Sequence, residues 1–506
     1  MNPRTIRELL GCGDDNAAAL TTPAGKPLSY KALRELVDDI TRAMASRDIG
    51  PNDRVAIVLD NGPEMAAAFL CIASAATAAP LNPNYRAEEF EFYLSDLRAK
   101  LLVVAQEKES PAIDVAKKLN VPVARLRAVP EMGAGAFGLE FDGGPPKPAE
   151  APRAAPDDIA LVLHTSGTTS RPKIVPLSHA NVCASAKNVS DSLALTAGDR
   201  GLVIMPLFHI HGLIAALLAP LSAGGEVCCS TGFNALKFFG WMDEVRPTWY
   251  TGVPTMHQAI LMRAPGNAEV IRSHRLRFIR SSSSSMPVKV IGDLESLFGV
   301  PVIEAYGMTE AAHQMASNAL PPRQRKAGTV GPAAGPEMRV ADARGDTVPS
   351  GVTGEIVIRG PNVMRSYENN PQANADAFYG DWFRTGDQGT MDENGYITIT
   401  GRLKEIINRG GEKVSPREVD EILMEHPAVH QCVTFGMPHD MLGEEVAAAI
   451  VLKQGAEASD RELREFARAK LADFKVPKKI LILAEIPVGA TGKLQRIGLA
   501  QKLGLG

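Results

Sequence analysis

The sequence has few of the features that mark secreted, zinc-binding or nucleic-acid-binding proteins. Only six cysteines occur among 506 residues, and none forms a C-x-x-C pair or stands at a zinc-type spacing from histidines. We therefore expect reduced, structural thiols. The formal net charge is only −4, which gives no electrostatic reason to bind nucleic acid.

Long apolar runs are also missing. The most apolar stretch, residues 201–229, is interrupted by prolines, histidines and a glutamate, so it predicts buried strand, loop and helix rather than a membrane span. Residues 1–20 lack the apolar core of a signal peptide, and the ending LGLG is no retrieval or peroxisomal signal. We expect a cytoplasmic protein, with no membrane partner, that acts on a small charged metabolite.

What the sequence does contain is an alternation of helix-forming and strand-forming segments. Residues 28–47 predict an amphipathic helix, residues 54–60 a short apolar strand, and residues 64–78 an Ala-rich helix, with another strand from Leu101. The Pro/Ala-rich residues 143–156 suit neither a helix nor a central strand. This segment predicts a surface linker between lobes.

After the linker the alternation continues and then changes character. A strand, a Gly/Ser/Thr loop and a helix from about Ser178 are followed by apolar strands such as GLVIMP, WYTGVP and PVIEAYG, which is typical of a mostly parallel, doubly wound sheet. Residues 328–399 have short β-like runs with Gly and Pro turns and predict a small β subdomain.

A final stretch of helix and strand begins near Gly401. Its length suits an independent small α/β domain, and its Gly-rich turn suits a movable joint. The sequence thus predicts an α/β protein with a large N-terminal domain of doubly wound sheets plus a small β subdomain, residues 1–402. A small mobile C-terminal α/β domain, residues 403–506, would follow.

Four segments combine residue types that suit nucleotide chemistry. Residues 165–173 (TSGTTSRPK) follow a strand and offer small residues, hydroxyls and a cation, as a phosphate-binding loop requires. Residues 304–310 (EAYGMTE) supply an aromatic face for a purine, a hydroxyl for a phosphate oxygen and a carboxylate for Mg²⁺. Asp387, after a turn, could accept hydrogen bonds from ribose hydroxyls. Lys493 follows a Gly-rich turn from which a long cation can project.

In this order, and with the segment GRLK at residues 401–404, these motifs resemble the adenylate-forming superfamily of acyl-CoA synthetases, luciferases and adenylation domains. The strings PLFHIHGL, WYTGVPTMHQ, RFIRSSSSS and EAYGMTEAAHQMASN are similar to the oxalate:CoA ligase branch. The resemblance implies that an acid, ATP and CoA give an acyl-CoA, AMP and pyrophosphate through an acyl-adenylate. The implied ATP- and AMP-binding residues are Thr165, Ser166, Gly167, Thr168, Thr169, Lys173, Glu304, Ala305, Tyr306, Gly307, Thr309, Asp387, Arg402 and Lys493.

The resemblance also implies roles for individual residues. Lys493 would be the adenylation lysine, bridging the acid carboxylate and the α-phosphate, and Thr309 and Glu310 would complete the catalytic set, with Glu310 holding Mg²⁺. The small domain would swing about Lys404. In the thioester-forming state Gly410 and Gly411 would border the CoA path, and acetylation of Lys493 by a lysine acetyltransferase would silence the enzyme.

The acid itself is expected to be oxalate, a dianion with no apolar surface to bury. Its second carboxylate needs several convergent donors, and the expected acid site offers His209, His211, Ser283 and His313. His209, Ser283 and His313 match the branch's oxalate contacts best. Departures from the plant-like pattern at Gly252, Gly307, Ala312, Ser282 and Ser284 put strict selectivity in doubt.

Two alternatives remain open at this stage. A CoA ligase for malonate or another short- or medium-chain acid would share every ATP motif and differ only in the acid pocket. An adenylation module or a luciferase-like enzyme would share the adenylation half alone, although no carrier domain follows Lys493 in the given sequence.

Overall fold

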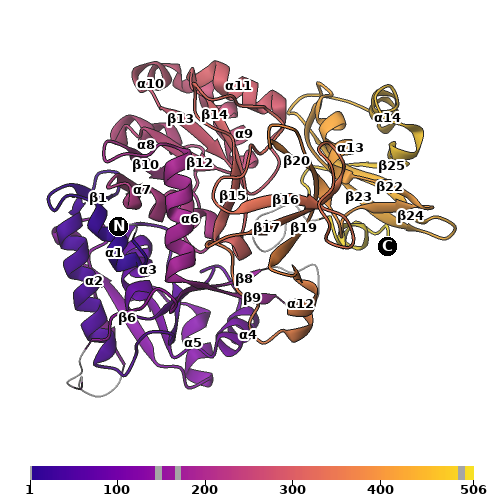
Figure 1. The fold of residues 1–506 in the computed structure, drawn as a ribbon. Helices are drawn as coiled ribbons and strands as arrows, with labels where there is room; N and C mark the ends of the chain where they lie inside the picture. The colour runs from indigo at the N-terminus through magenta and orange to yellow at the C-terminus, as the bar shows by residue number, and fades with distance from the viewer. Residues whose placement is uncertain (1–2, 143–146, 148–150, 166–171, 488–495) are drawn as a thin grey trace. The chain divides into compact units, whose positions relative to one another are not determined.

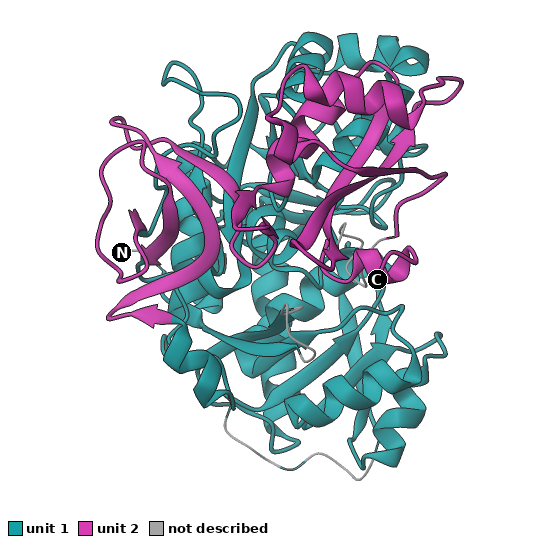
Figure 2. Cartoon of the chain, turned by 90° about the vertical axis from the view of Figure 1, so that its right-hand side faces the viewer, with its two compact units in different colours: residues 1–337, 359–377 teal, residues 338–358, 378–506 magenta. Residues whose placement is uncertain are grey.

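The computed structural model describes residues 3–142, 147, 151–165, 172–487 and 496–506. The chain divides into two compact units (Figure 2). The first consists of residues 1–337 and 359–377, and the second of residues 338–358 and 378–506.

Two largely parallel sheets form the frame of the first unit (Figure 1). The larger has the order β15-β14-β13-β12-β10-β11-β1-β2, with antiparallel strands at both edges. Its strands are β1 (Ala18–Thr21), β2 (Leu28–Ser29), β10 (Arg200–Val203), β11 (Glu226–Cys229), β12 (Trp249–Gly252), β13 (Phe278–Ser281), β14 (Val302–Met308) and β15 (His313–Ser317).

The second sheet of this unit has the order β7-β6-β5-β3-β4-β8-β9, again with antiparallel edge strands. Its strands are β3 (Arg54–Val58), β4 (Thr77–Pro80), β5 (Leu101–Ala105), β6 (Val123–Ala128), β7 (Phe137–Phe141), β8 (Ile159–Thr165) and β9 (Lys173–Ser178). Both sheets confirm the predicted doubly wound α/β fold.

Helices flank and separate these sheets. Helix α3 (Pro63–Ala75) contacts strands of both sheets, and it is apolar and buried almost all round, as a helix between two sheets must be. The longer helices of the unit are α2 (Tyr30–Ala45), α4 (Ala87–Leu97), α5 (Pro111–Lys118), α6 (His179–Ser192), α8 (Phe238–Val245), α9 (Pro254–Arg263) and α11 (Val288–Phe298). The shorter ones are α1 (Ile6–Leu9), η1 (Leu10–Cys12), η2 (Pro130–Met132), the π-helix η3 (His211–Leu218), α7 (Ala219–Ser222), η4 (Ala264–Asn267), α10 (Ala268–Ser273), η5 (Thr309–Ala311) and α12 (Pro371–Asp376).

The second unit contains two five-stranded sheets. One consists of β16 (Glu337–Ala341), β17 (Gly354–Arg359), β18 (Phe378–Tyr379), β19 (Trp382–Met391) and β20 (Ile397–Arg402), and it confirms the predicted β subdomain. The other consists of β21 (Ile407–Arg409), β22 (Glu412–Val414), β23 (Val429–His439), β24 (Gly443–Leu452) and β25 (Lys479–Ile482). Its helices are α13 (Pro416–Met424), α14 (Asp460–Arg468), η6 (Asp473–Lys475) and α15 (Leu499–Lys502).

The predicted boundary after Arg402 falls inside the second unit, between β20 and β21. Hydrogen bonds cross it, because Ser415, the N-cap of α13, and Arg417 in α13 both donate to backbone carbonyls of β20. The boundary between residues 402 and 403 stays a prediction.

Two local predictions differ from the structure. The predicted Ala-rich helix ends at Ala75, and residues 77–80 form strand β4, because Ala fits a fully buried strand as well as a helix. Strand β9 was not expected between the phosphate-binding loop and helix α6, but α6 begins at His179, close to the start predicted at about Ser178. Half of the predicted linker, residues 143–146 and 148–150, lies outside the described residues.

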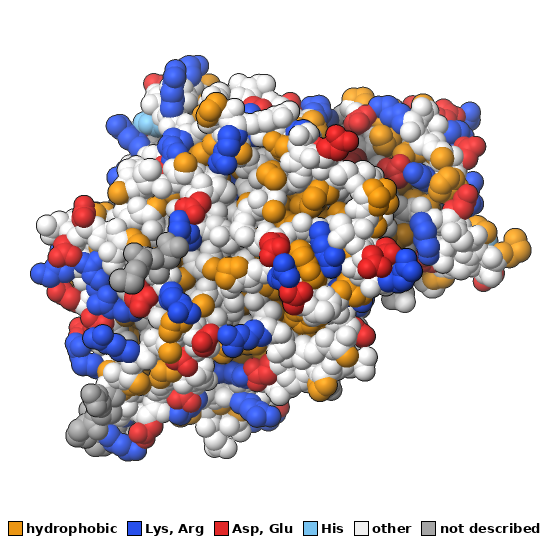
Figure 3. Space-filling view, viewed as in Figure 1, with side chains coloured by type: hydrophobic (Ala, Val, Ile, Leu, Met, Phe, Trp, Pro, Cys, Tyr) orange, Lys and Arg blue, Asp and Glu red, His pale blue; other side chains and the backbone are white. Residues whose placement is uncertain are grey.

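The surface agrees with the small net charge. On the face shown in Figure 3, basic and acidic side chains are interspersed. No helix among the described residues is long and apolar enough to cross a membrane.

Candidate active site

The predicted phosphate-binding loop connects strands β8 and β9. Thr165 is the last residue of β8 and pairs with Lys173, the first residue of β9. Both ends of the loop are therefore fixed in the sheet. Ser166, Gly167, Thr168 and Thr169 lie outside the described residues, as does Lys493.

The segment Glu304, Ala305, Tyr306 and Gly307 lies in β14, which runs parallel to β13 and antiparallel to β15. The β14–β15 pairing shifts between Tyr306 and Gly307. A Cβ on Gly307 would lie 1.8 Å from the His313 carbonyl oxygen, so only glycine allows this close approach. The Glu304 carboxylate is buried and accepts a hydrogen bond of 3.1 Å from the Gly328 amide.

Thr309 and Glu310 follow directly in the short helix η5. The Glu310 side chain is buried and accepts a hydrogen bond of 2.8 Å from the Tyr367 hydroxyl. The ammonium of Lys173 lies 4.3 Å from the centre of the same tyrosine ring. Tyr367 thus joins the predicted phosphate-binding cation to the predicted metal-binding carboxylate.

Tyr367 was not predicted as a site residue, because no motif or periodicity in the sequence marks it. Its neighbours hold η5 in place: the Asn362 amide donates to the carbonyls of Ala311 and Gln314 at 2.8 and 2.9 Å, and the Met364 amide donates to the Glu310 carbonyl at 2.8 Å. These contacts join segments some 50 residues apart, which sequence patterns do not report.

The residues around Glu310 fit Mg²⁺ delivered with ATP. Mg²⁺ in nucleotide enzymes uses one or two carboxylates together with phosphate oxygens and water. Among the described residues, no group of three or more His, Cys, Asp and Glu side chains could hold a metal without such help. The buried Glu310 carboxylate, which Tyr367 holds in place, is a donor of the kind that this chemistry uses.

Two of the three predicted acid-binding residues belong to one buried polar cluster. His211 Nδ1 lies 3.0 Å from Ser283 Oγ, and the rings of His211 and His313 stack with centroids 4.9 Å apart. The guanidinium of Arg280 donates to Nε2 of His211 at 3.2 Å and to Nε2 of His313 at 3.1 Å. His209 is half-buried, and its ring lies 4.6 Å from that of Phe208.

Backbone strain marks the same cluster. Ser283 has φ +73° and His313 has φ +97°, and neither is glycine. Such conformations cost on the order of 1–3 kcal/mol each and concentrate at functional sites. The fold therefore maintains two unfavourable conformations where these two side chains meet the cluster.

The serines of residues 281–285 have different partners. The Ser282 hydroxyl donates to the Ala305 carbonyl at 2.9 Å, Ser281 faces the Met286 sulfur at 3.5 Å, and Ser284 is exposed. Ser283 is the member of the run in hydrogen-bonding distance of a histidine. Gly252, another departure from the plant-like pattern, leaves space where a Cβ would approach the His257 ring to 3.3 Å.

The cluster is held by elements distant in sequence. His211 begins the buried π-helix η3, and Arg280 lies in β13. A Cβ on Gly212 would lie 2.2 Å from the Pro206 carbonyl oxygen, so the turn before η3 requires glycine. Arg280 was not predicted as a site residue, because an arginine inside an apolar strand carries no mark of its partners.

The remaining predicted residues belong to the second unit. Asp387 in β19 is nearly buried and accepts a hydrogen bond of 3.0 Å from Nε of Arg402, its register partner in β20. Lys404 is exposed between β20 and β21. Gly410 and Gly411 form the β21–β22 turn with φ of +61° and +98°, conformations that favour glycine.

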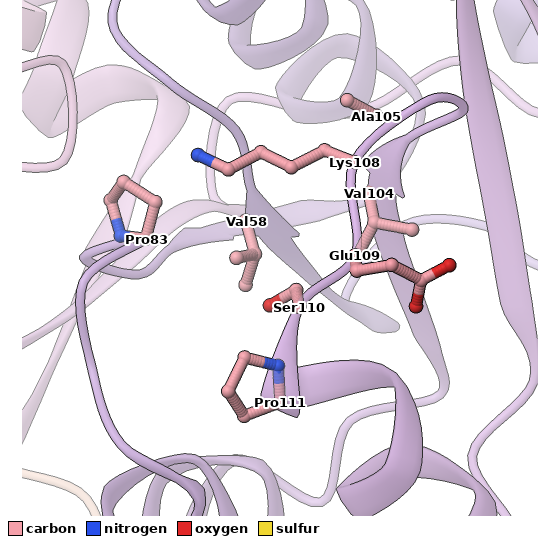
Figure 4. Close-up of a pocket in the computed structure, with 8 residues that line it drawn as sticks. All are labelled: Val58, Pro83, Val104, Ala105, Lys108, Glu109, Ser110 and Pro111. Carbon is pink, nitrogen blue, oxygen red and sulfur yellow. The ribbon is translucent and has the colours of Figure 1, made fainter.

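A small cavity elsewhere in the first unit is no candidate for this site. It lies beside β3 and β5 and is lined by Val58, Val104 and Pro111 among others (Figure 4). Its volume of about 30 Å³ is room for one or two waters. No predicted site residue lines it.

Residues 13–368 match the AMP-binding enzyme family, and residues 418–493 match the AMP-binding enzyme C-terminal domain. The chain belongs to the AMP-binding enzyme family. It is 42% identical to the oxalate–CoA ligase of Arabidopsis thaliana, over 96% of this chain and 95% of the relative, and 39% identical to that of Saccharomyces cerevisiae, over 96% and 94%. Family membership and these relatives confirm the predicted adenylate-forming fold and the assignment as an AMP-forming acid–thiol ligase.

A solved structure agrees over the whole chain. ATP-bound MatB from Rhodopseudomonas palustris superposes with a TM-score of 0.88 at 29% identity, covering 99% of both chains. The α/β architecture with its large N-terminal and smaller C-terminal parts is therefore that of a known group of adenylate-forming enzymes.

Proposed function

We propose that this enzyme converts oxalate, ATP and CoA into oxalyl-CoA, AMP and pyrophosphate through an oxalyl-adenylate. The observation that supports it best is the cluster of buried His211, His313 and Arg280 with half-buried Ser283, which offers donors and positive charge instead of an apolar channel. Two relatives of about 40% identity are oxalate–CoA ligases. A dianion of two carbons suits such a pocket.

In the adenylation step a carboxylate oxygen of the acid attacks the α-phosphorus and pyrophosphate leaves. Tyr306 would stack on adenine, Ala305 and Gly307 would line that face, and Asp387 with Arg402 would bind the ribose. The phosphates would lie along the loop of Thr165, Ser166, Gly167, Thr168, Thr169 and Lys173. Thr309 would contact the α-phosphate.

Mg²⁺ held by Glu310 would screen the phosphate charge and stabilise the negative charge that develops during transfer. Tyr367 keeps that carboxylate in place through its hydroxyl, and its ring keeps Lys173 beside it. This arrangement supports the assignment of Glu310 over a purely structural role for that residue.

Lys493 would bridge the acid carboxylate and the α-phosphate, because two anions approach one another only when cations offset their repulsion. The C-terminal domain, residues 403–506, would then rotate about Lys404. The thiolate of CoA, arriving past Gly410 and Gly411, would attack the activated carbonyl and release AMP. Acetylation of Lys493 by a lysine acetyltransferase would remove the charge that adenylation needs. The enzyme would act in the cytoplasm.

An assay of CoA-dependent AMP release tests the acid. We expect oxalate to give the highest kcat/KM among oxalate, malonate, acetate, octanoate and an aromatic acid. Highest activity with octanoate or the aromatic acid would overturn the proposed substrate while leaving the ligase chemistry intact.

Two other readings are separated by the same assay. A ligase for malonate or another short- or medium-chain acid would prefer that acid in the panel. An adenylation module or luciferase-like enzyme would exchange pyrophosphate into ATP with its acid but release no AMP on addition of CoA.

A further inference from the structure

Arg280 is a buried cation without a carboxylate partner. Its side chain is fully buried in β13, and its hydrogen bonds go to Thr251 Oγ1 at 3.3 Å, Gln314 Oε1 at 3.2 Å and the two histidines. Within the described part of the chain no Asp or Glu pairs with it, and its Nε has no hydrogen-bond partner. Burial lowers the pKa of Arg280 to about 9. Burying an uncompensated charge is costly.

The chemistry of the guanidinium fixes the protonation of both rings. Arginine donates hydrogen bonds and accepts none, so the Nε2 atoms of His211 and His313 must act as acceptors. A protonated imidazolium has no acceptor. Both rings are therefore neutral, and each carries its proton on Nδ1.

The tautomer has a consequence at Ser283. His211 Nδ1–H donates to Ser283 Oγ at 3.0 Å, and Thr251 Oγ1 lies 2.6 Å from His211 Nε2, where its hydroxyl can donate. Because Ser283 Oγ accepts from His211, its own hydroxyl proton is left to point elsewhere. The hydrogen bonds from Arg280 to His211 and from His211 to Ser283 thus orient the Ser283 hydroxyl as a donor.

We propose that Arg280 is a positioning residue that sets acid specificity: it holds His211 and His313 as neutral Nδ1–H donors and places an unpaired positive charge behind them for an acid with a second anionic group. This inference rests on the proposed function, since it concerns the acid pocket of the ligase. The missing counter-ion of Arg280 is the second carboxylate of the substrate.

The first experiment needs no substitution at Arg280. ¹⁵N NMR of the histidine-labelled full chain at neutral pH, with His211→Gln and His313→Gln used for assignment, reports the tautomer of each ring. We expect a protonated Nδ1 and a bare Nε2 for both. An Nε2–H tautomer or a doubly protonated ring at either position would overturn the proposal.

The second experiment compares oxalate with glyoxylate, which has the same two carbons but one carboxylate. Arg280→Met should lower kcat/KM for oxalate about 100-fold, mostly through KM, because a buried charge interaction is lost, and should lower that for glyoxylate less than about 5-fold. Arg280→Lys keeps the charge and should retain more of the oxalate preference than Arg280→Met.

Arg277→Met is the matched control, because Arg277 lies next to the same strand but pairs with Asp199 and is partly exposed. It should leave the oxalate-to-glyoxylate ratio unchanged. Equal losses for both acids in Arg280→Met, or equal ratios in the Met and Lys variants, would overturn the role of the charge. A wild-type enzyme that prefers glyoxylate would instead refute the proposed substrate, while the NMR result would still decide the tautomers.

Discussion

Each unit holds an arginine in a polar cluster, and the two arginines differ in their partners: Arg280 in the first unit is fully buried, and Arg496 in the second is half-buried. In the second unit Arg496 forms ion pairs with Asp420 of α13 and, at 3.2 Å, with Glu405. Burial alone would lower the pKa of Arg496, but the charges of Asp420 and Glu405 raise it above its usual value. In the first unit the partners of Arg280 among the described residues are neutral, and burial lowers its pKa.

The difference separates two uses of a buried charge. A compensated ion pair fixes the structure around it, and Arg496 anchors the chain three residues after Lys493 to Glu405, the neighbour of Lys404. An uncompensated charge has binding energy left for a ligand. The comparison can be tested from each side.

The largest expected effect is on the paired side. Arg496→Met should destabilise the protein by about 3–5 kcal/mol, because it leaves Asp420 buried without its cation. Asp420→Asn added to Arg496→Met should recover most of this loss, since the amide oxygen can still accept from the Thr434 amide, as Asp420 does at 2.6 Å. Urea unfolding of the single and double variants measures both.

Arg461→Met is the control for that experiment. Arg461 forms an exposed ion pair of 2.9 Å with Glu465 in α14, and solvent screening leaves such a pair little effect on stability. If Arg496→Met destabilises the protein no more than Arg461→Met does, the contrast drawn between Arg496 and Arg280 is wrong.

Substitution of Lys493 tests whether the catalytic role of this lysine can be separated from the anchoring role of Arg496 in the second unit. Lys493→Ala should slow adenylate formation about 100- to 1,000-fold, because one cation at the reacting phosphate is lost, without the instability of Arg496→Met. Thioester formation from a supplied acyl-adenylate should be spared. Pyrophosphate exchange and AMP release measure the two halves, and comparable losses in both would refute the assigned role.

Hinge function has a complementary signature. Lys404→Pro should damage thioester formation more than adenylation, since proline restricts the backbone rotation on which domain movement depends. The same two assays report it, and a selective loss of adenylation would contradict the hinge.

In the first unit, the neutral hydroxyl of Tyr367 donates a hydrogen bond to the Glu310 carboxylate. Tyr367→Phe removes the hydrogen bond to Glu310, which for a charged acceptor corresponds to about a 10-fold or larger loss, and we expect it as a raised Mg²⁺ requirement for adenylation. Tyr379→Phe is the control, because that ring also lies 4.3 Å from a cation, Arg384, but its hydroxyl donates to the Ala343 carbonyl at 3.3 Å and belongs to the second unit. If the wild-type enzyme and Tyr367→Phe give the same Mg²⁺ titration, Tyr367 does not position Glu310 for Mg²⁺.

The smallest effect is on acid stability and should also distinguish the units. Burial lowers the pKa of His179 and of His257 to about 4, so the unfolded chain binds these protons first as the pH falls. Stability should therefore decrease from about pH 6.5 toward pH 4, by less than about 1 kcal/mol per histidine between pH 7 and 6. Hydrogen exchange should show the loss in the first unit, and His179→Gln should reduce it.

The sequence predicted best where local patterns decide the structure. Amphipathic α2, the apolar strand β3 and the start of α6 near Ser178 agree with prediction because each depends on neighbours in sequence. Strand β4 was mistaken for helix because an Ala-rich run carries no period that separates the two when every residue is buried.

For the site, too, residues in local motifs could be predicted from the sequence and residues defined by distant contacts could not. The motif residues Glu304 to Glu310 could be named from sequence because they are contiguous, and the structure places them on β14 and η5. Arg280 and Tyr367 could not, since their importance depends on partners in other elements, namely His211, His313 and Glu310. Resemblance supplied Ser283 and His313 but not the cation behind them.

The π-helix that begins at His211 has a consequence for how such a pocket changes over evolution. A π-turn typically contains one residue more than an α-turn, and one residue corresponds to about 100° of rotation along an ordinary helix. Deleting a single residue from the buried run after His211 would thus turn its ring away from Arg280 and Ser283 while the chain stayed apolar and helical. A lineage could exchange one acid for another by a change in length, with every ATP-binding motif untouched.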